Sequence, residues 1–494
     1  MPHLPDLLAE AQTSEERFLR QIFVRDQMAE WSKRPLLMAK ADGVHYWDVD
    51  GKPYLDALSG IYTVSVGHNN RRVIEAIRRQ LDTLHFSPPM HGSNPVAVQL
   101  ANLISQLAPA LRAGEGFGER GSAAPKPTSP QPSSREAGGE GDKRLGNWSV
   151  KFECAGSEVT EASFKLARQY HRLTGNPGKY KIISRYLSWH GSTLGSLSAS
   201  GLKSRKTVNE PLAPGFLHVF PPTCYRCPFG KQYSDCGITC ATLIGDMIEM
   251  EDPSTVAAII VEPIGHTGGI IDPPPEYLPI LRDICDRYNV LLIFDEIITG
   301  MGRTGQMFAA ETFGVVPDVI CTAKGLSGGF IPLSAMVTRR SIADAFWGPA
   351  ESNPGFVEGH TFEGSPLACA AGIAVLREII DHDLCANARK QGEVLRAGFE
   401  RLAKKYAVIG DIRGKGLLQG IEFVKDLKTK ERFAMNPAFG VRVGKRALAN
   451  GLLCRFDPHW LAFGPALNST TEQVEEMLAL LDRSLGEVMH EIAG

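Results

Sequence analysis

The chain has 494 residues, 43% of them hydrophobic, which is enough apolar surface for two large cores. Its 53 Lys and Arg residues nearly balance 55 Asp and Glu residues, so the net charge of −2 excludes a strongly basic, nucleic-acid-binding surface and gives no sign of binding to an anionic membrane. There is no run of about 18 apolar residues and no secretory signal pattern, so we expect a cytoplasmic protein without transmembrane helices.

The first predicted elements are a β-hairpin over residues 45–60, with its turn at Asp50-Gly51, and a helix over 71–84. A second helical pattern covers 100–111. Residues 113–144 then contain 7 Gly, 4 Pro and 4 Ser and a single large apolar residue. Such a segment cannot bury enough surface to offset the entropy lost on ordering, so we predict a disordered low-complexity insertion there.

After the insertion, strand and helix patterns alternate. Short apolar runs rich in Val and Ile predict buried parallel strands, and helices are predicted between them; the strands are expected at 148–154, 180–184, 256–263 and 289–296, and the helices at 159–173, 240–250 and 276–288. This order predicts an α/β fold with a mostly parallel sheet and helices on both faces.

From about residue 346 the pattern changes to two longer helices, at 366–380 and 384–406, followed by a hairpin at 412–424. We therefore predict a large domain over 66–345 and a smaller α+β domain over 346–494. The N-terminal segment 1–65 is expected to complete the small domain.

Several polar residues follow predicted strands, where open α/β sheets bind their ligands. Asp295 ends a buried strand, and burial of a carboxylate calls for a cationic partner. Lys324 follows another apolar strand, where desolvation can lower the pKa of its amine and make it a nucleophile. Taken singly, each has an ordinary alternative: a helix-capping carboxylate and a solvated lysine.

Three further positions fit an anionic or planar ligand. Gly156 and Ser157 lie between a strand and a helix, where backbone N–H groups can bind an anion, although a simple N-cap is equally consistent. Trp189 could stack on a planar ring or belong to the core. Thr361 is a hydroxyl just ahead of a helix and a second candidate for contacting a phosphate.

The glycines of the segment GMGRTG, at 300, 302 and 305, match the dinucleotide-binding pattern GxGxxG. That pattern requires the glycines directly after a strand and at the start of a helix. Here the segment EIIT intervenes, and a nicotinamide cofactor is therefore disfavoured.

At these residues the sequence resembles the class III (ω-amino) aminotransferases, which are fold-type-I pyridoxal-phosphate (PLP) enzymes. The resemblance covers about 41–110 and 147–485, and its most specific part is DEIITGMGRTG followed by PDVICTAKG, with Lys324 placed 29 residues after Asp295. It implies a seven-stranded large domain, a smaller domain and PLP as the cofactor.

The resemblance also implies the roles of the site residues. Lys324 would carry PLP as a Schiff base and move the substrate proton, and Asp295 would hold the pyridinium N–H. Trp189 and Ile297 would sandwich the ring, whereas Gly156 and Ser157 would bind its phosphate. Thr361 would reach the phosphate of the neighbouring subunit, which requires a homodimer.

Departures from the family pattern bear on the substrate. The chain has VEPIGHTGG where many members have VEPIQGxGG, so Glu262 is kept as a pocket residue without the role of the missing Gln. Leu461 stands where ornithine-type members carry a carboxylate-binding Arg. Arg455 instead matches a mobile Arg of the amine–pyruvate type, and Tyr62 matches a pocket aromatic of that subgroup. An Arg can bind a keto-acid carboxylate bidentately.

Four cysteines, Cys224, Cys227, Cys236 and Cys240, form the pattern C-x2-C-x8-C-x3-C. Such thiols could hold zinc or an iron–sulfur cluster, although x8 is short for a pair of zinc knuckles. We favour packed or free thiols, and no metal ligand is assigned.

We therefore predict a PLP-dependent transaminase that moves an amino group from an amine or ω-amino acid to a 2-oxo acid, with pyruvate as the expected acceptor, in a ping-pong cycle. A racemase, an aminomutase or a dialkylglycine decarboxylase on the same scaffold stays open, as does an inactive scaffold or binding protein. Lesser residues are expected to be structural: Arg303 and Thr304 would brace the loop after Asp295, Arg413 would act within the small domain, and His190 receives no role.

Overall fold

The structure, a computed structural model, describes residues 36–110, 147–349, 351, 353, 355–436 and 438–493. The predicted insertion at 113–144 and the first 35 residues of the predicted N-terminal segment lie outside the described residues.

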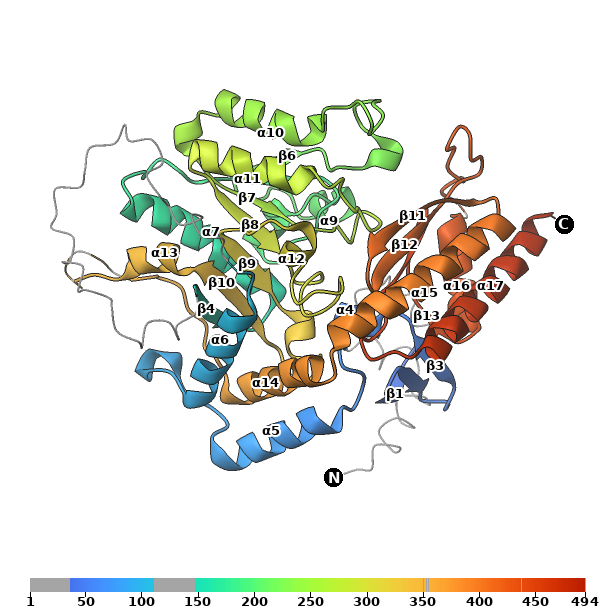
Figure 1. The fold of residues 1–494 in the computed structure, drawn as a ribbon, viewed down its shortest axis with the longest axis horizontal. Helices are drawn as coiled ribbons and strands as arrows, with labels where there is room; N and C mark the ends of the chain where they lie inside the picture. Colours follow the sequence, from blue (N-terminus) through green and yellow to red (C-terminus); the bar gives the residue numbers. More distant parts are fainter. Residues whose placement is uncertain are drawn as a thin grey trace.

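A seven-stranded sheet forms the centre of the larger lobe (Figure 1), in the order β4-β10-β9-β8-β7-β5-β6. Its strands are β4 (Trp148–Glu153), β5 (Lys181–Arg185), β6 (Phe216–Val219), β7 (Val256–Val261), β8 (Leu291–Asp295), β9 (Val319–Thr322) and β10 (Ser334–Arg339). Only β10 runs antiparallel to its neighbours β4 and β9. The other six strands therefore end at the same edge of the sheet, which confirms the predicted α/β fold with a mostly parallel sheet.

The central strands are apolar on both faces because helices cover both. Every residue of β7, β8 and β9 is buried. Ile260 and Ile293 pack in the same cluster as residues of α7 (Gly156–Leu173), whereas Ile259 and Phe294 join the core that includes α10 (Thr239–Met250) and α11 (Tyr277–Tyr288). Continuous Val- and Ile-rich runs, rather than alternating ones, are what two covered faces require.

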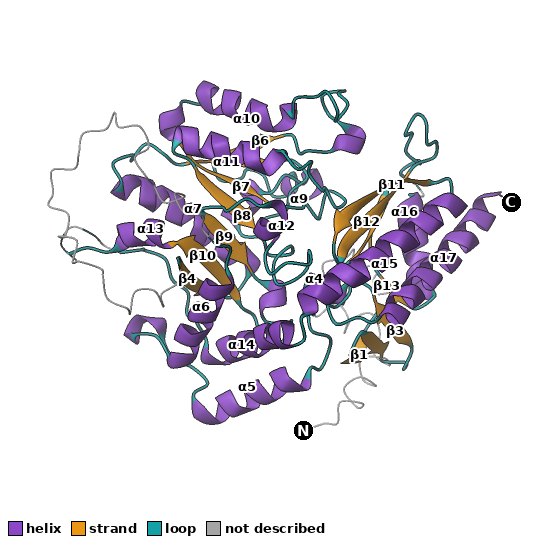
Figure 2. Cartoon of the chain, viewed as in Figure 1, coloured by secondary structure: helices purple, strands orange, loops and turns teal. Residues whose placement is uncertain are grey.

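The remaining helices surround the sheets (Figure 2). They are α4 (Ser59–Tyr62), α5 (Arg71–Thr83), α6 (Pro95–Leu107), α8 (Leu194–Ala199), α9 (Lys203–Lys206), α12 (Ala309–Phe313), α13 (Arg340–Ala343), α14 (Pro366–Asp381), α15 (Leu384–Lys405), α16 (Phe439–Ala449) and α17 (Thr471–Ala493). Short 3₁₀ turns include η3 (Cys224–Arg226) and η5 (Lys324–Leu326). Among the described residues, none of the helices combines the length and the apolar character needed to span a membrane.

Two smaller sheets form the other lobe. One has the order β11-β12-β15-β14, with β11 (Ile409–Lys415), β12 (Leu418–Phe423), β14 (Arg455–Asp457) and β15 (Trp460–Phe463), and α15 packs against it. The other joins β1 (Met38–Asp42), β2 (His45–Asp48) and β3 (Pro53–Asp56) to β13 (Leu452–Leu453), so strands from near both ends of the chain share one sheet (Figure 1).

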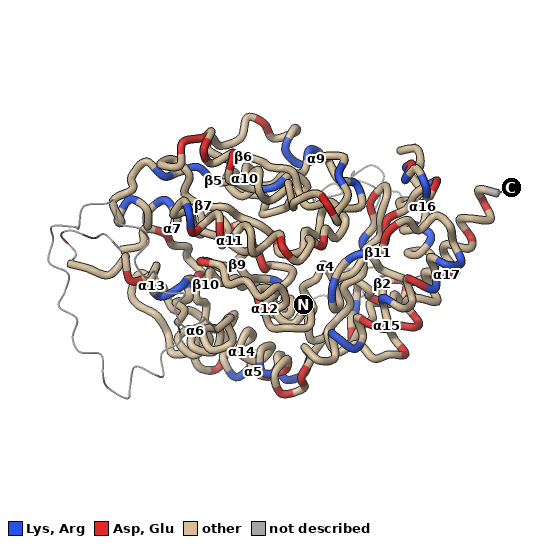
Figure 3. The backbone as a smooth tube through the Cα atoms, turned by 45° about the horizontal axis from the view of Figure 1, so that its top comes forward, with Lys and Arg blue, Asp and Glu red and all other residues tan. Residues whose placement is uncertain are grey.

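Helix α14, which the sequence pattern grouped with the small domain, contacts α5 and α6 beside the large sheet. The proposed boundary at residue 346 stays a prediction. Acidic and basic residues are interspersed along the outer helices, for example α15 and α17 (Figure 3), in keeping with the net charge near zero.

Candidate active site

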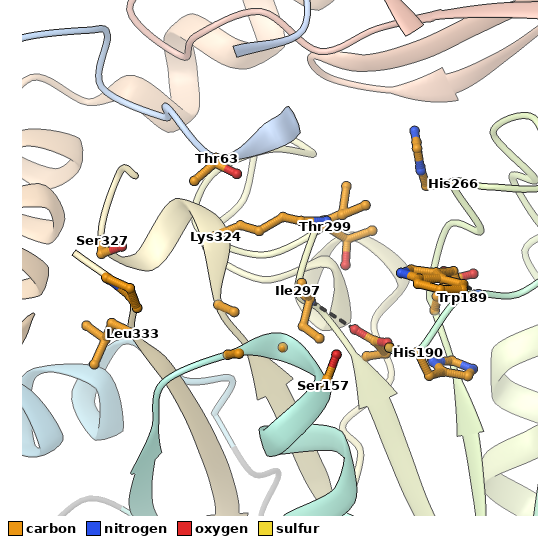
Figure 4. Close-up of a pocket in the computed structure, with 18 of the residues that line it drawn as sticks. Thr63, Ser157, Trp189, His190, His266, Ile297, Thr299, Lys324, Ser327 and Leu333 are labelled. Atoms are coloured by element: carbon orange, nitrogen blue, oxygen red, sulfur yellow. Dashed lines mark hydrogen bonds and ion pairs between the residues drawn. The ribbon is translucent and has the colours of Figure 1, made fainter. Parts of the chain in front are cut away.

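A pocket of about 400 Å³ lies at the carboxyl edge of the large sheet (Figure 4). Residues that follow β4, β5, β7, β8 and β9 line it, because these parallel strands all end there. Seven of the predicted site residues are gathered around it: Gly156, Ser157, Trp189, Glu262, Asp295, Ile297 and Lys324.

Asp295 is the last residue of β8 and is only 4% exposed. Its Oδ1 accepts a hydrogen bond from the backbone N–H of Ile297 at 3.1 Å, and its Oδ2 lies 2.7 Å from Nδ1 of His190. Because a carboxylate can only accept, the imidazole N–H donates in this pair. The carboxylate is thus held in place by the imidazole N–H and a backbone N–H, and its remaining lone pairs can accept from a ligand.

Lys324 begins the turn η5 directly after β9, with φ of 43°. This left-handed conformation is uncommon for a residue other than glycine, and such strain is concentrated at functional sites. Figure 4 shows its side chain extending across the centre of the pocket toward Thr299. A primary amine is therefore presented in the same pocket as the Asp295 carboxylate.

The N-terminus of α7 borders the pocket at Gly156 and Ser157. Ser157 Oγ accepts a hydrogen bond from the backbone N–H of Ser192 at 2.9 Å, so its own hydrogen is available to an anion. A Cβ at Gly156 would lie 2.9 Å from the Ile297 side chain, and one at Gly191 would lie 2.6 Å from Ser157 Oγ. The close approach of these segments requires glycine at Gly191, whereas at Gly156 the end of the Ile297 side chain would have to shift.

Trp189 lies opposite the end of the Lys324 side chain, and Ile297 lies between them and α7 (Figure 4). The backbone N–H of Trp189 donates to Glu262 Oε1 at 3.3 Å. The side chains of Trp189 and Ile297, which lie in the loops after β5 and β8, are positioned to bound a planar ligand from two sides.

Glu262 follows β7 and is 6% exposed. Burial raises the pKa of its carboxyl group to about 7. Arg185 Nη2 lies 4.0 Å from Glu262 Oε2 and donates to the Glu262 backbone carbonyl at 2.5 Å. This long ion pair does not offset the effect of burial on the pKa of the carboxyl group.

The other predicted residues lie outside the pocket lining. Tyr62 is buried behind it, and its hydroxyl bonds to Nε2 of His266 at 2.8 Å. Arg455 pairs with Asp457 at 3.1 Å, with its guanidinium 5.7 Å from the centre of the Trp460 ring. Thr361 is exposed and belongs to none of the pocket walls of its own chain.

Two histidines of the site were not anticipated. His190, to which the sequence analysis gave no role, is buried against Asp295, and His266 lines the pocket where the family pattern has a glycine. A signal for His190 was present, since it directly follows Trp189 at a strand end. Its pairing with a residue 105 positions away was not readable from one sequence.

The donor set fits the PLP that the resemblance implies. The pocket combines a carboxylate for a ring nitrogen, a primary amine for an aldehyde, two apolar walls and a helix N-terminus for a phosphate. A Cβ at Gly156 or Gly191 would make close contacts beside this helix end, so the lack of a side chain at these two glycines keeps the space there open.

Comparisons with known proteins agree with this geometry. The family model described as aminotransferase class-III matches residues 27–118 and 142–485. The chain is 37% identical over 423 residues to the probable aminotransferase Rv3329 of Mycobacterium tuberculosis, covering 85% of this chain and 82% of that one. It is 33% identical over 462 residues to the taurine–pyruvate aminotransferase of Bilophila wadsworthia, covering 92% and 93%. An amine transaminase from an uncultivated Pseudomonas species, solved in its PLP-bound form, superimposes with a TM-score of 0.83 at 30% identity, covering 96% of this chain and 99% of that one.

Proposed function

The chain belongs to the class-III aminotransferases and is a PLP-dependent transaminase; from this premise we propose that it transfers an amino group from an amine or an ω-amino acid to pyruvate by a ping-pong mechanism. The observation that carries the proposal is the placement of Asp295 and Lys324 in one pocket at the ends of neighbouring strands. Bound PLP supplies an electron sink that acidifies the substrate Cα–H.

The residues of the chain have separate tasks in this proposal. Asp295, held by the His190 N–H, keeps a proton on the ring nitrogen. The Lys324 amine would hold the cofactor between turnovers, and once freed it would accept the substrate Cα proton and deliver it to the carbon of the cofactor's aldehyde group. Ser157 and the N–H groups at the start of α7 bind the phosphate, while Trp189 and Ile297 exclude water from the two ring faces.

We assign the binding of the acceptor's carboxylate to Arg455. Its partner Asp457 is partly exposed, so the ion pair between them contributes little and can be exchanged for a substrate carboxylate. With Arg455 paired to Asp457, no arginine is among the residues that line the pocket in the described part of the chain, and an uncharged amine donor is accommodated. The taurine–pyruvate relative uses the same class of acceptor by its name, which supports pyruvate.

We also propose that the active form is a homodimer in which Thr361 contacts the phosphate of the partner's site. The exposure of Thr361 outside its own pocket supports this arrangement. Sedimentation of the enzyme as a monomer under assay conditions would contradict it.

The test is a half-reaction measurement on Lys324→Ala and on the unchanged enzyme. The unchanged enzyme should lose the visible absorbance of bound PLP when amines, β-alanine, 4-aminobutyrate, taurine or diamines are added, and regain it with pyruvate. Lys324→Ala should bind PLP but fail to retain it covalently after borohydride reduction, as mass spectrometry would show. An unchanged enzyme whose absorbance no donor of the panel alters would overturn the transaminase assignment.

Arg455→Ala separates the acceptor assignment from the rest. We expect at least a tenfold higher KM for pyruvate, because a charged hydrogen-bond pair is worth about 1.5–3 kcal/mol, with the donor half-reaction unchanged. Arg442→Ala, which removes a partly exposed arginine paired with Glu491 on α17, is the control. Unaltered pyruvate affinity in Arg455→Ala would refute the role of Arg455.

A further inference from the structure

The four cysteines of the pattern C-x2-C-x8-C-x3-C gather around a second, much smaller cavity. Cys224, Cys227, Cys236 and Cys240 all line it, and all four are free thiols. The cavity shares no lining residue with the active-site pocket. Nothing in the transaminase mechanism uses these side chains.

Tight local turns bring the two cysteine pairs together. Cys224 begins the turn η3 and Cys227 directly follows it, and the Cys227 carbonyl accepts a hydrogen bond from Gly230 N at 3.1 Å. The Cys236 carbonyl accepts one from Thr239 N at 3.2 Å, and Cys240 then lies in the first turn of α10. Although only eight residues separate the two pairs, all four cysteines line the same cavity.

The size of the cavity decides what it can hold. Its volume is about 20 Å³, and one water-sized particle needs about 10–15 Å³. This leaves room for a single ion. Four thiols with x2 and x3 spacings are the ligand set of structural zinc sites.

We propose that Cys224, Cys227, Cys236 and Cys240 bind a single zinc ion in this cavity. The sequence pattern alone favoured free thiols because of the short x8 segment, and the convergence of both pairs on one ion-sized space is the new observation. Four thiolates on zinc leave two negative charges. Lys231, which also lines the cavity, and the positive end of α10 offset that charge.

Binding requires the four sulfur atoms to move closer together. No three of the four sulfur atoms lie within 4.8 Å of one another in the structure. A Zn–S distance of about 2.3 Å in a tetrahedron brings them to about 3.8 Å. The ion would therefore draw the segment 224–240 together and fix its conformation.

That segment connects the two lobes. Arg226, between the first two ligands, pairs with Glu422 of β12, and Lys430 donates to the Tyr225 carbonyl at 2.9 Å. Glu422 also binds Arg413 at 2.9 Å, and Arg413 donates to the carbonyl of Gly269, close to His266 in the pocket. A bound zinc would stabilise this connection without touching the reacting groups.

The test uses the holoenzyme produced with zinc in the medium and purified without chelators. Elemental analysis should find one zinc per chain in the unchanged enzyme and in Cys385→Ser, a control at a half-buried cysteine outside the quartet. The double variants Cys224→Ser/Cys227→Ser and Cys236→Ser/Cys240→Ser should lose it. A strong chelator should lower the thermal midpoint of the unchanged enzyme by several degrees and leave that of the double variants unaltered.

Should a double variant fail to fold, the single variant Cys224→Ser at the exposed ligand gives the same comparison. The proposal is overturned by enzyme that contains no zinc and takes up none when zinc alone is added at micromolar concentration. Stoichiometric iron with acid-labile sulfide, or a disulfide between members of the quartet in freshly purified protein, would overturn it as well.

Discussion

At the scale of single residues, the site depends on a buried carboxylate that an imidazole N–H and a backbone N–H hold in place. Asp295 is fixed by an imidazole N–H and a backbone N–H, not by an arginine. An arginine there would neutralise the carboxylate and weaken its hold on a ring nitrogen. The geometry thus keeps the acceptor strength of Asp295 for the ligand.

His190→Phe tests this positioning role. It keeps a ring in the buried space but removes the donor to Asp295, and loss of a hydrogen bond to a charged group costs about 1.5–3 kcal/mol. We expect kcat to fall by about ten- to a hundredfold. As the pH is raised, the variant should also lose more of the absorbance of PLP with a protonated ring than the unchanged enzyme does.

His171→Phe is the matched control, since His171 is equally buried but bonds to the carbonyl of Ala257 away from the pocket. It should lower stability and leave kcat close to that of the unchanged enzyme. Equal kcat values in the two variants would contradict a positioning role for His190.

Glu262 gives a pH prediction. Because burial raises the pKa of this carboxyl group to about 7, the folded protein binds its proton more tightly than the unfolded chain does. Stability is therefore favoured at low pH and falls as the pH rises from about 4.5 through 7, by up to about 3 kcal/mol. Urea unfolding at pH 5.5 and 8 should show a smaller drop in Glu262→Gln than in the unchanged enzyme, whereas parallel pH dependences would contradict the shift.

At the scale of elements, the start of α7 and the loop after β5 are packed at the limit of what glycine allows. Gly191 has φ of 148°, and a Cβ there would lie 2.6 Å from Ser157 Oγ and 2.8 Å from Ser157 Cα. These contacts are backbone and short side-chain atoms, which cannot move away without displacing the helix end.

Gly191→Ala should therefore weaken PLP binding by about tenfold or more, since forced strain of this kind costs about 1–3 kcal/mol. Gly175→Ala, at the other end of α7, also places alanine at a positive φ, here 82°, but its Cβ would meet nothing within 4 Å. It should lower stability only. Equilibrium dialysis of PLP against both variants makes the comparison, and equal affinities would show that the contact with Ser157 is unimportant.

At the scale of the whole molecule, Arg303 connects the loop after β8 to the smaller lobe. Its guanidinium is buried and donates to the carbonyls of Pro465 and Leu417 and, at 3.0 Å, to Ser59 Oγ. Burial lowers the pKa of Arg303 to about 10. Three segments distant in sequence therefore meet at one side chain, which extends the bracing role predicted for it.

Arg303→Met should lower the free energy of unfolding by about 2–5 kcal/mol, because it leaves buried acceptors without donors. Arg401→Met removes an exposed pair with Glu475 and should cost less than about 1 kcal/mol. Urea unfolding measures both. A loss at Arg303 no larger than that at Arg401 would show that the lobes are joined by other contacts.

Much of the local structure was predictable because it depends on periodicity. Val- and Ile-rich runs predicted β5, β7 and β8, and helical spacing predicted α5, α7, α10 and α11 to within a few residues. The pairing of β3 with β13 and the docking of α14 against α5 were not readable, since they join segments far apart in the chain.

The sequence by itself determined the family, the cofactor and the residues expected to hold it, because motifs such as DEIITGMGRTG keep residue types and spacings that neighbouring strand ends require. Only the tertiary structure decided which side chains meet. It paired His190 with Asp295, placed His266 on Tyr62, left Arg455 outside the pocket wall and gathered four thiols around one small cavity. Contacts of this kind depend on the packing of distant segments, and no local pattern in a single sequence encodes them.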